Sequence, residues 1–335
     1  MSSAPDATEI VRDAAWLVQA LDSASAMVRV VKMDRDAYRA ASFLDDRMLQ
    51  QPHFAGVVPW ASIANAVPSD ARSDARWIFH MGHVGSTLVA RLLGEIENVL
   101  SVREPRILRD LAMLPGERRS EYAEPVRKLL SRTFAADEIA LVKATSFVSE
   151  MAPELLPAGE RALFMYATPT NYIASILAGE NSVKELAALA PSRAQRIAGR
   201  AQLAQPRNAA ESAAAAWACE MTALEAAADS LPDAHVMWAD FDDMLGDMTN
   251  ALARVAQFFG FEAPADRIHA IATGPLMRRY SKATEHEYSP SLRAELIAEA
   301  TAANRAEIDS ALAMLQSAAQ TSPLLARALD RAKES

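Results

Sequence analysis

The 335-residue sequence is poor in cysteine, glycine and aromatic residues. Cys219 is its single cysteine, which excludes a disulfide-stabilised fold and suits a reducing compartment. No stretch approaches the roughly 18 uncharged apolar residues of a membrane span. The first sixteen residues carry acidic side chains and no apolar centre, so they do not read as a secretory signal. We therefore expect a cytoplasmic protein that makes no membrane contact.

Basic residues do not outnumber acidic ones. The formal net charge is −9, which argues against nucleic-acid binding, because that binding relies on basic surface. With 51% hydrophobic and 23% charged residues, the composition is that of a globular protein. Alanine, by contrast, is abundant and clustered, as in residues 210–228. Because alanine has the highest helix propensity, these clusters predict helices.

Residues 1–75 read as an N-terminal α/β extension. The apolar spacing predicts a helix over residues 8–21, a strand over 26–34 and a helix over 34–49. A polar, turn-rich segment, "PSDARSD" at 68–74, then joins this extension to the rest of the chain.

From residue 76 the chain alternates between short apolar runs and helical patterns. The runs "RWIFHM" (76–81), "EIALVKAT" (138–145), "ALFMYAT" (162–168) and "AHVMWAD" (234–240) predict four buried strands. Strands separated by helices indicate a helix-rich α/β fold, a three-layer sandwich with a mainly parallel central sheet, which we place at residues 76–330. Ligands of such folds bind beyond the carboxyl ends of the strands.

The first of these strands leads into "GHVGST", residues 82–87. Two glycines permit unusual backbone angles, and the following helix would offer free amides and a partial positive charge to an anion. This pattern predicts a phosphate-binding loop (P-loop). The alternative is an ordinary turn in which Ser86 or Thr87 caps the helix. The lysine of the ATP-binding pattern G-x-x-x-x-G-K-[ST] is absent, which argues against ordinary triphosphate hydrolysis.

The loop resembles that of the sulfotransferase family, which binds 3′-phosphoadenosine 5′-phosphosulfate (PAPS). Against the family pattern P-K-S-G-T-T, Gly82 stands at the proline, His83 at the lysine and Val84 at the serine. Gly85 matches the family's glycine, and the hydroxyl pair Ser86 and Thr87 matches its two threonines.

Three later segments resemble the same family, in the same order, so that the resemblance covers about residues 76–262. In "LVKATSF" Lys143 matches, whereas Thr145 stands where many members carry a catalytic histidine. Ser175 matches a serine that binds the donor's 3′-phosphate, and Thr168 falls near the family's arginine. The resemblance implies transfer of a sulfuryl group from PAPS to a hydroxyl or amine of a small-molecule or glycan acceptor, without a metal.

Three residues are our candidates for catalysis. His83 or Lys143 would supply the cation near the leaving oxygen, and Glu104, just before Pro105, stands where some sugar-modifying members keep a glutamate base. Lys282, in a late basic segment, is a further donor-binding candidate. We expect the helical stretch 182–230 to form part of the acceptor wall.

Two alternatives to a sulfotransferase remain at the level of sequence. The first is a P-loop kinase-like, ATP-dependent phosphotransferase, which would need Asp240 or Asp242 to hold magnesium. The second is a non-catalytic protein that binds a nucleotide or a partner through a degraded site.

Overall fold

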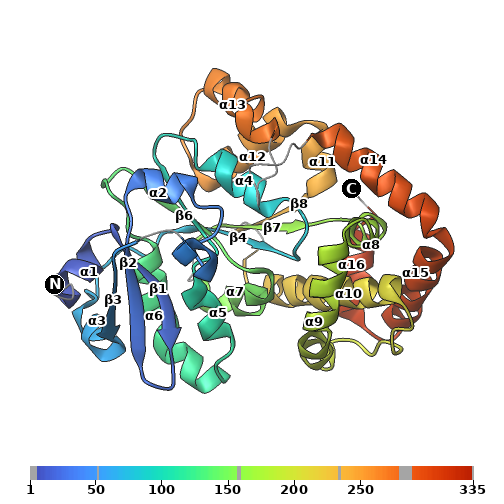
Figure 1. Cartoon of the computed structure of the whole chain (residues 1–335), viewed down its shortest axis with the longest axis horizontal. Coiled ribbons are helices and arrows are strands. Elements are labelled where there is room, and N and C mark those ends of the chain that lie inside the picture. Colours follow the sequence, from blue (N-terminus) through green and yellow to red (C-terminus); the bar gives the residue numbers. More distant parts are fainter. Residues whose placement is uncertain (1–5, 51–52, 157–159, 233–234, 279–288, 334–335) are drawn as a thin grey trace.

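The computed structural model describes residues 6–50, 53–156, 160–232, 235–278 and 289–333. Its N-terminal part contains an antiparallel sheet in the order β1-β2-β3 (Figure 1). The strands are β1 (Trp16–Asp22), β2 (Met27–Lys32) and β3 (Ala55–Pro59). Around them lie α1 (Ala7–Arg12), α2 (Arg35–Ala40), the 3-10 helix η1 (Asp46–Gln50) and α3 (Trp60–Ala66).

The predicted helix over residues 8–21 is wrong beyond Arg12. Residues 16–21 are all buried and form β1, the outer strand that pairs with β2. Such a short apolar run fits one face of a helix and a fully buried strand equally well, so periodicity does not separate them. The helix expected over 34–49 is likewise divided into α2 and η1. The strand expected over 26–34 is confirmed as β2.

The N-terminal sheet shares a continuous hydrophobic core with the rest of the chain and is hydrogen-bonded to it. The Leu21 amide of β1 donates to Asp110 at 2.9 Å, and the Leu44 amide donates to the Arg103 carbonyl at 2.7 Å. The buried guanidinium of Arg103 donates to the carbonyls of Tyr38 and Ala41, and burial lowers the pKa of Arg103 to about 9. These contacts fix residues 38–47 against Arg103, at the end of an outer strand of the central sheet. The boundary at residue 75 stays a prediction.

The central sheet is parallel and has five strands in the order β5-β6-β4-β7-β8, which confirms the predicted fold class. The strands are β4 (Arg76–His80), β5 (Val99–Arg103), β6 (Ile139–Lys143), β7 (Ala162–Tyr166) and β8 (Val236–Asp240). Four of these strands were predicted from the sequence, whereas β5 was not. That strand carries Ser101 and Arg103, both buried, and two polar residues in a five-residue run hide its apolar character.

Helices connect the strands and cover both faces of the sheet (Figure 1). The connections contain α4 (Ser86–Leu93), α5 (Arg106–Ala112), α6 (Gly116–Leu130), η2 (Ser146–Met151), α7 (Ala152–Leu155), α8 (Pro169–Leu177), α9 (Glu180–Ile197) and α10 (Ala209–Ala228). After β8 follow α11 (Phe241–Gly246), α12 (Met248–Phe259), α13 (Ala265–Ala272), η4 (Pro275–Arg278), α14 (Pro290–Ala303), α15 (Arg305–Ala319) and α16 (Pro323–Arg331).

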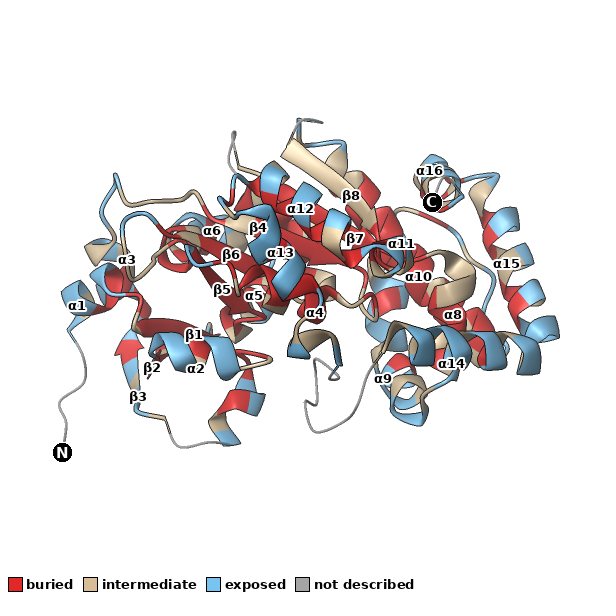
Figure 2. Ribbon diagram, turned by 90° about the horizontal axis from the view of Figure 1, so that it is seen from above, coloured by how far each residue is buried: buried red, intermediate tan, exposed pale blue. Residues whose placement is uncertain are grey.

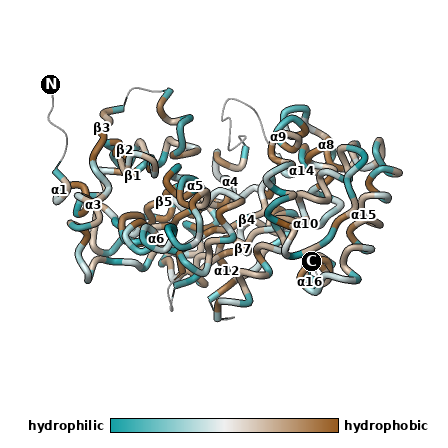
Figure 3. The backbone as a smooth tube through the Cα atoms, turned by 90° about the horizontal axis from the view of Figure 1, so that it is seen from below, coloured by the Kyte–Doolittle hydropathy of each residue, from teal (hydrophilic) through white to brown (hydrophobic). Residues whose placement is uncertain are grey.

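The alanine-rich helix α10 lies inside the molecule. Figure 2 shows it buried along with the central strands, whereas α14 and α15 expose one side to solvent. In Figure 3, hydrophilic and hydrophobic residues alternate along α15, as expected of a helix with one covered face. Among the described residues, no helix is long and apolar enough to cross a membrane.

The end of β4 lies at the point where the strand order of the central sheet reverses. The chain passes from β4 to β5 and β6 on one side, and then to β7 and β8 on the other. At such a reversal the connections leave on opposite sides and open a crevice at the carboxyl edge. Residues 82–87 follow β4 and therefore lie in this crevice.

Candidate functional site

A cavity of about 780 Å³ opens at the carboxyl edge of the central sheet. Its floor comes from the loop after β4 and from residues that follow β5 and β6. Its walls come from α8, α9, α11 and α14, and from residues 43–47 of the N-terminal part. The lining includes His83, Glu104, Lys143, Ser175 and every residue from Gly82 to Thr87 that the sequence predicted. The fold thus brings the predicted site residues that it describes into one cavity.

The loop 82–87 turns sharply, through three residues with left-handed backbone angles. Gly82, His83 and Gly85 have φ values of 86°, 55° and 59°. His83 is not a glycine, so its angle is strained, and such strain concentrates at functional sites. Consecutive turns of this kind expose backbone amides on one side and form an anion-binding concavity.

His80, at the end of β4, holds the start of the loop. Its Nδ1 accepts from the Gly82 amide at 3.0 Å, which leaves the ring proton on Nε2, and Nε2 donates to the Ala144 carbonyl at 2.9 Å. The buried ring thereby links the loop after β4 to the residue that follows β6. The Gly82 amide is consequently already bonded to His80.

The hydroxyls of Ser86 and Thr87 do not cap the helix. Gly85 is the N-cap residue of α4 and makes no side-chain cap, so Ser86 and Thr87 occupy the first two helical positions. Thr87 is 2% exposed, and its Oγ1 has no hydrogen-bond partner among the described residues. Thr145 Oγ1, on the cavity wall, is also buried without a hydrogen-bond partner among the described residues. Because buried polar atoms in folded proteins are nearly always hydrogen-bonded, two unpaired hydroxyls on one cavity point to a polar ligand.

Gly85 has a second reason to be glycine. A Cβ atom at this position would lie 1.9 Å from the Phe241 ring at the start of α11. Phe241 is buried and lines the cavity beside the loop. Any side chain at Gly85 would therefore displace Phe241, so substitutions here disturb packing as well as anion binding.

Glu104 and Lys143, two of the predicted catalytic residues, form a buried ion pair with each other. β5 and β6 are neighbours in the sheet, so the residues at their ends meet, and the Glu104 amide also donates to the Lys143 carbonyl at 2.7 Å. The Lys143 side chain is only 1% exposed. Since its ammonium faces a carboxylate, Lys143 brings no net positive charge to the loop 82–87.

Glu104 is held under backbone strain in front of Pro105. Its φ is 51°, a left-handed angle that favours glycine. Arg47 approaches the second carboxylate oxygen at 3.4 Å and forms a closer pair with Asp45. Two cations from different parts of the chain therefore approach one strained carboxylate at the cavity wall, and Asp45 shares one of them. Arg47 and Asp45 belong to the N-terminal part, which thus contributes to the site.

His83 faces α9 rather than the centre of the loop. Its Nε2 lies 3.7 Å from the Glu185 carboxylate, and its ring packs edge-on against Tyr172 with centroids 6.3 Å apart. The His83 side chain is 18% exposed. The ring therefore lies between Glu185 of α9 and Tyr172 of α8, beside the loop 82–87.

The predicted 3′-phosphate residues are only partly brought together. Ser175 lines the cavity, and its hydroxyl donates to the Tyr172 carbonyl at 2.9 Å. Thr168, near the family's arginine, is instead the N-cap of α8 and accepts from the Asn171 amide. Lys282 lies outside the described residues. From the same late basic segment Arg293 does line the cavity, and its Nη2 is buried without a partner among the described residues.

The acidic residues required by the kinase-like alternative bind groups of the protein itself, except that Asp240 Oδ2 is buried without a partner among the described residues. Asp240 Oδ1 accepts from the amides of Asp242 and Asp243 and so caps α11. Both oxygens of Asp242 are occupied, one by Asn171 and the other by Arg293, each at 2.9 Å. Burial raises the pKa of Asp240 to about 6, which disfavours the charged form that a cation would need.

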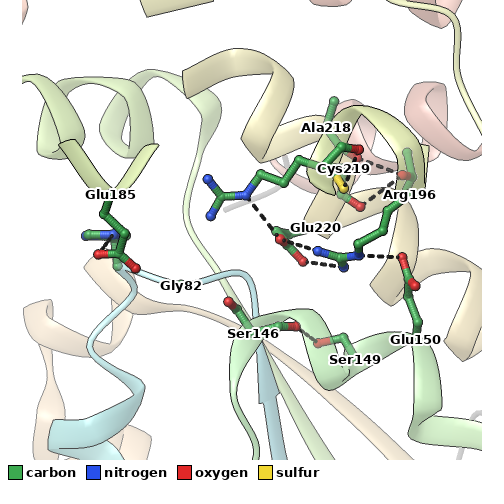
Figure 4. A network of polar contacts seen from close by, with 12 residues as sticks. Gly82, Ser146, Ser149, Glu150, Glu185, Arg196, Ala218, Cys219 and Glu220 are labelled. Carbon is green, nitrogen blue, oxygen red and sulfur yellow. Dashed lines mark hydrogen bonds and ion pairs between the residues drawn. The ribbon is translucent and has the colours of Figure 1, made fainter. Parts of the chain in front are cut away.

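A cluster of arginines and carboxylates joins α9, α10 and η2 behind the cavity. Figure 4 shows Arg196 between Glu150 and Glu220, which come from η2 and α10. Arg193 and Arg200 extend this cluster. Of the stretch 182–230 expected to form the acceptor wall, the residues that line the cavity come from α9, whereas α10 lies in the core.

Several lining residues were not predicted as site residues. Arg193 was included only as part of the stretch 182–230, Phe241 was not singled out, and Phe43, Arg47 and Leu296 belong to segments distant from the loop in sequence. A signal existed only for Phe241, which directly follows the predicted strand end at Asp240.

No family model matches the chain, and no curated protein is similar to it in sequence. Solved structures similar to it include a sulfotransferase domain from the curacin biosynthetic pathway, 12% identical, with 66% of this chain and 86% of that chain covered and a TM-score of 0.41. A sulfotransferase from Alicyclobacillus acidocaldarius is 17% identical, with coverage of 71% and 96% and a TM-score of 0.40. A mouse sulfotransferase complexed with PAP is 11% identical, with coverage of 61% and 65% and a TM-score of 0.31.

All three are named as sulfotransferases, the family that the loop resembles. At these identities and TM-scores the likeness does not bear on donor, acceptor or activity. The chain is a helix-rich α/β protein with a five-stranded parallel sheet, and its loop 82–87 lies at the reversal of strand order.

Proposed function

We propose that the protein transfers a sulfuryl group from PAPS to a hydroxyl or amine acceptor. The observation that carries the proposal is the buried Thr87 hydroxyl, which lacks a partner among the described residues at the start of α4. It lies beside a loop with three left-handed residues and next to the amides of the first helical turn. An anionic group of the donor would satisfy the hydroxyl and these amides together.

The residues of the cavity fit the parts of this donor. The loop suits its 5′-phosphosulfate, and Ser175, on α8, suits a second phosphate group. Phe241 and the apolar side chains of α14 offer an apolar surface to a nucleobase. The size of the cavity, about 780 Å³, is within the range of small-molecule sites, with room for a donor and part of an acceptor.

In the proposed reaction the acceptor oxygen or nitrogen attacks the sulfur while the bond from sulfur to the 5′-phosphate oxygen breaks. The electron pair of that bond goes to the leaving phosphate, whose charge the loop amides and Thr87 stabilise. A protonated His83 ring, whose charge Glu185 offsets, donates a hydrogen bond to the leaving phosphate. Glu104 accepts the proton of the acceptor, and Lys143 and Arg47 keep it in place.

Calorimetry with 3′-phosphoadenosine 5′-phosphate (PAP) and with Mg-ATP, in parallel, tests the donor assignment. We expect binding of PAP and weak or no binding of Mg-ATP. A preference for Mg-ATP would overturn the proposal in favour of a phosphotransferase. Transfer of labelled sulfate from PAPS to a panel of alcohols, amines and glycans then tests the reaction, and PAP binding without transfer to any acceptor would leave only the binding function.

A further inference from the structure

The cluster behind the cavity contains more positive than negative charge. Arg196 binds both oxygens of Glu220 at 2.9 Å and approaches Glu150 at 3.0 Å. Arg200 reaches the same Glu150 at 2.9 Å. Arg193 contacts Glu220 only through its Nε, at 3.4 Å. Three guanidinium groups thus share two carboxylates, which leaves one positive charge without a counter-charge in the cluster.

The buried thiol of Cys219 does not supply the missing negative charge. Burial raises the pKa of Cys219 to about 12, so the thiol stays neutral near pH 7. Its Sγ donates to the Arg193 carbonyl at 3.5 Å, a contact that helps to fix the backbone of α9.

Arg193 is the member of the cluster that borders the cavity. Its side chain is 10% exposed, and its Nη1 and Nη2 have no hydrogen-bond partner within the part of the chain that the structure describes. Ser182, Glu185, Leu189 and Arg193 recur at helical spacing and all line the cavity, so they form one face of α9. Arg193 therefore stands on the same helix face as Glu185, the partner of His83.

Two other cationic side chains of the cavity, Lys143 and His83, face carboxylates. Lys143 is paired with Glu104, and His83 approaches Glu185. The loop itself contains no lysine. A buried charge without a counter-charge is unfavourable, so the excess charge at Arg193 favours an anion in the cavity.

We propose that Arg193 binds the anionic group of the ligand held at residues 82–87 and supplies the positive charge that the loop lacks. The identity of this group as a phosphosulfate rests on the proposed function. Because Nε is anchored on Glu220, the guanidinium plane is oriented in advance, and its terminal nitrogens are suited to binding two oxygens of one anionic group.

Calorimetric titration with inorganic pyrophosphate, which resembles a phosphosulfate in size and charge, tests this assignment without the adenosine part. We expect Arg193→Gln to weaken pyrophosphate binding by about tenfold or more, since charge-assisted hydrogen bonds are lost. Arg193→Lys keeps the charge but loses the fork, and we expect an intermediate affinity. Lys184→Gln is the matched control, because it removes the same charge from the exposed side of α9, where Lys184 pairs only with Glu180.

Unchanged pyrophosphate affinity in Arg193→Gln, or an equal loss in Lys184→Gln, would overturn the assignment. So would the absence of pyrophosphate binding in the wild-type protein. Thermal unfolding of each variant identifies a folding defect, and Arg193→Lys then decides the result. If the wild-type protein binds pyrophosphate through Arg193 but does not bind PAP, the proposed function fails while the anion site stands.

Discussion

Replacing Thr87 with valine has two opposite expected effects. The substitution keeps the shape of the side chain and exchanges the buried hydroxyl for a methyl group. In the ligand-free protein this removes a polar atom that has no partner among the described residues. In the complex it removes a hydrogen bond to the donor. We therefore expect a more stable protein that binds its ligand less well.

The magnitudes follow from the burial of this residue. An unsatisfied buried polar group costs about 1–3 kcal/mol, and Thr87 is 2% exposed. Thr87→Val should raise the free energy of unfolding by about 1 kcal/mol or more. A hydrogen bond to a charged group contributes about 1.5–3 kcal/mol, so PAP affinity should fall by roughly tenfold to a hundredfold.

Urea denaturation and calorimetry with PAP measure the two effects on the same preparation. Thr222→Val is the control for stability, because Thr222 is equally buried but its hydroxyl donates to the Ala218 carbonyl at 2.7 Å. That variant should lose about 1 kcal/mol of stability. A loss of stability in Thr87→Val would show that the hydroxyl is satisfied within the protein. Unchanged PAP affinity would remove Thr87 from the site.

Three further predictions concern the charged residues of the site and the end of β8. Glu104→Gln should lower the free energy of unfolding by about 3–5 kcal/mol, because it leaves Lys143 buried without its counter-charge. Adding Lys143→Met should restore most of this stability but should not restore sulfate transfer. A denaturation series in which the double variant regains no stability contradicts the pairing. His83→Ala should reduce the rate of sulfate transfer by about tenfold or more and leave PAP affinity within about threefold, whereas loss of affinity alone would assign His83 to binding. Burial raises the pKa of Asp240 from 3.8 to about 6, so the folded chain retains a proton that the unfolded chain has lost, and stability should fall as the pH rises between those values. Asp240→Asn keeps the acceptor that caps α11 and should abolish this fall, and a wild-type pH dependence in that variant would refute the assignment.

Local features of the site followed from the sequence because they depend on neighbouring residues. The strand before residue 82, the unusual backbone angles at the loop glycines and the helix that follows the loop were all predicted. Gly260 likewise closes α12, with a φ of 74°. In each case one residue type with special backbone freedom, or a clear apolar period, determines the local structure.

The errors arose where short apolar runs fit more than one structure. Residues 16–21 are apolar except for Gln19, so they satisfied a helical period, yet they pair with β2 as a strand. β5 was missed because Arg103 and Ser101 are polar, although both are buried in the fold. Burial of an arginine requires carbonyl acceptors, and those of residues 38–41 come from a part of the chain that is distant in sequence.

The sequence by itself determined a glycine-containing loop between a strand and a helix, and an α/β fold around it. Only the tertiary structure decided which charges act there. The adjacency of β5 and β6 pairs Glu104 with Lys143 and so removes Lys143 as the cation for the loop. The packing of α9 against α10 leaves Arg193 as the excess positive charge at the cavity. Charge balance depends on distances between residues far apart in the chain, and strand order and helix packing fix those distances.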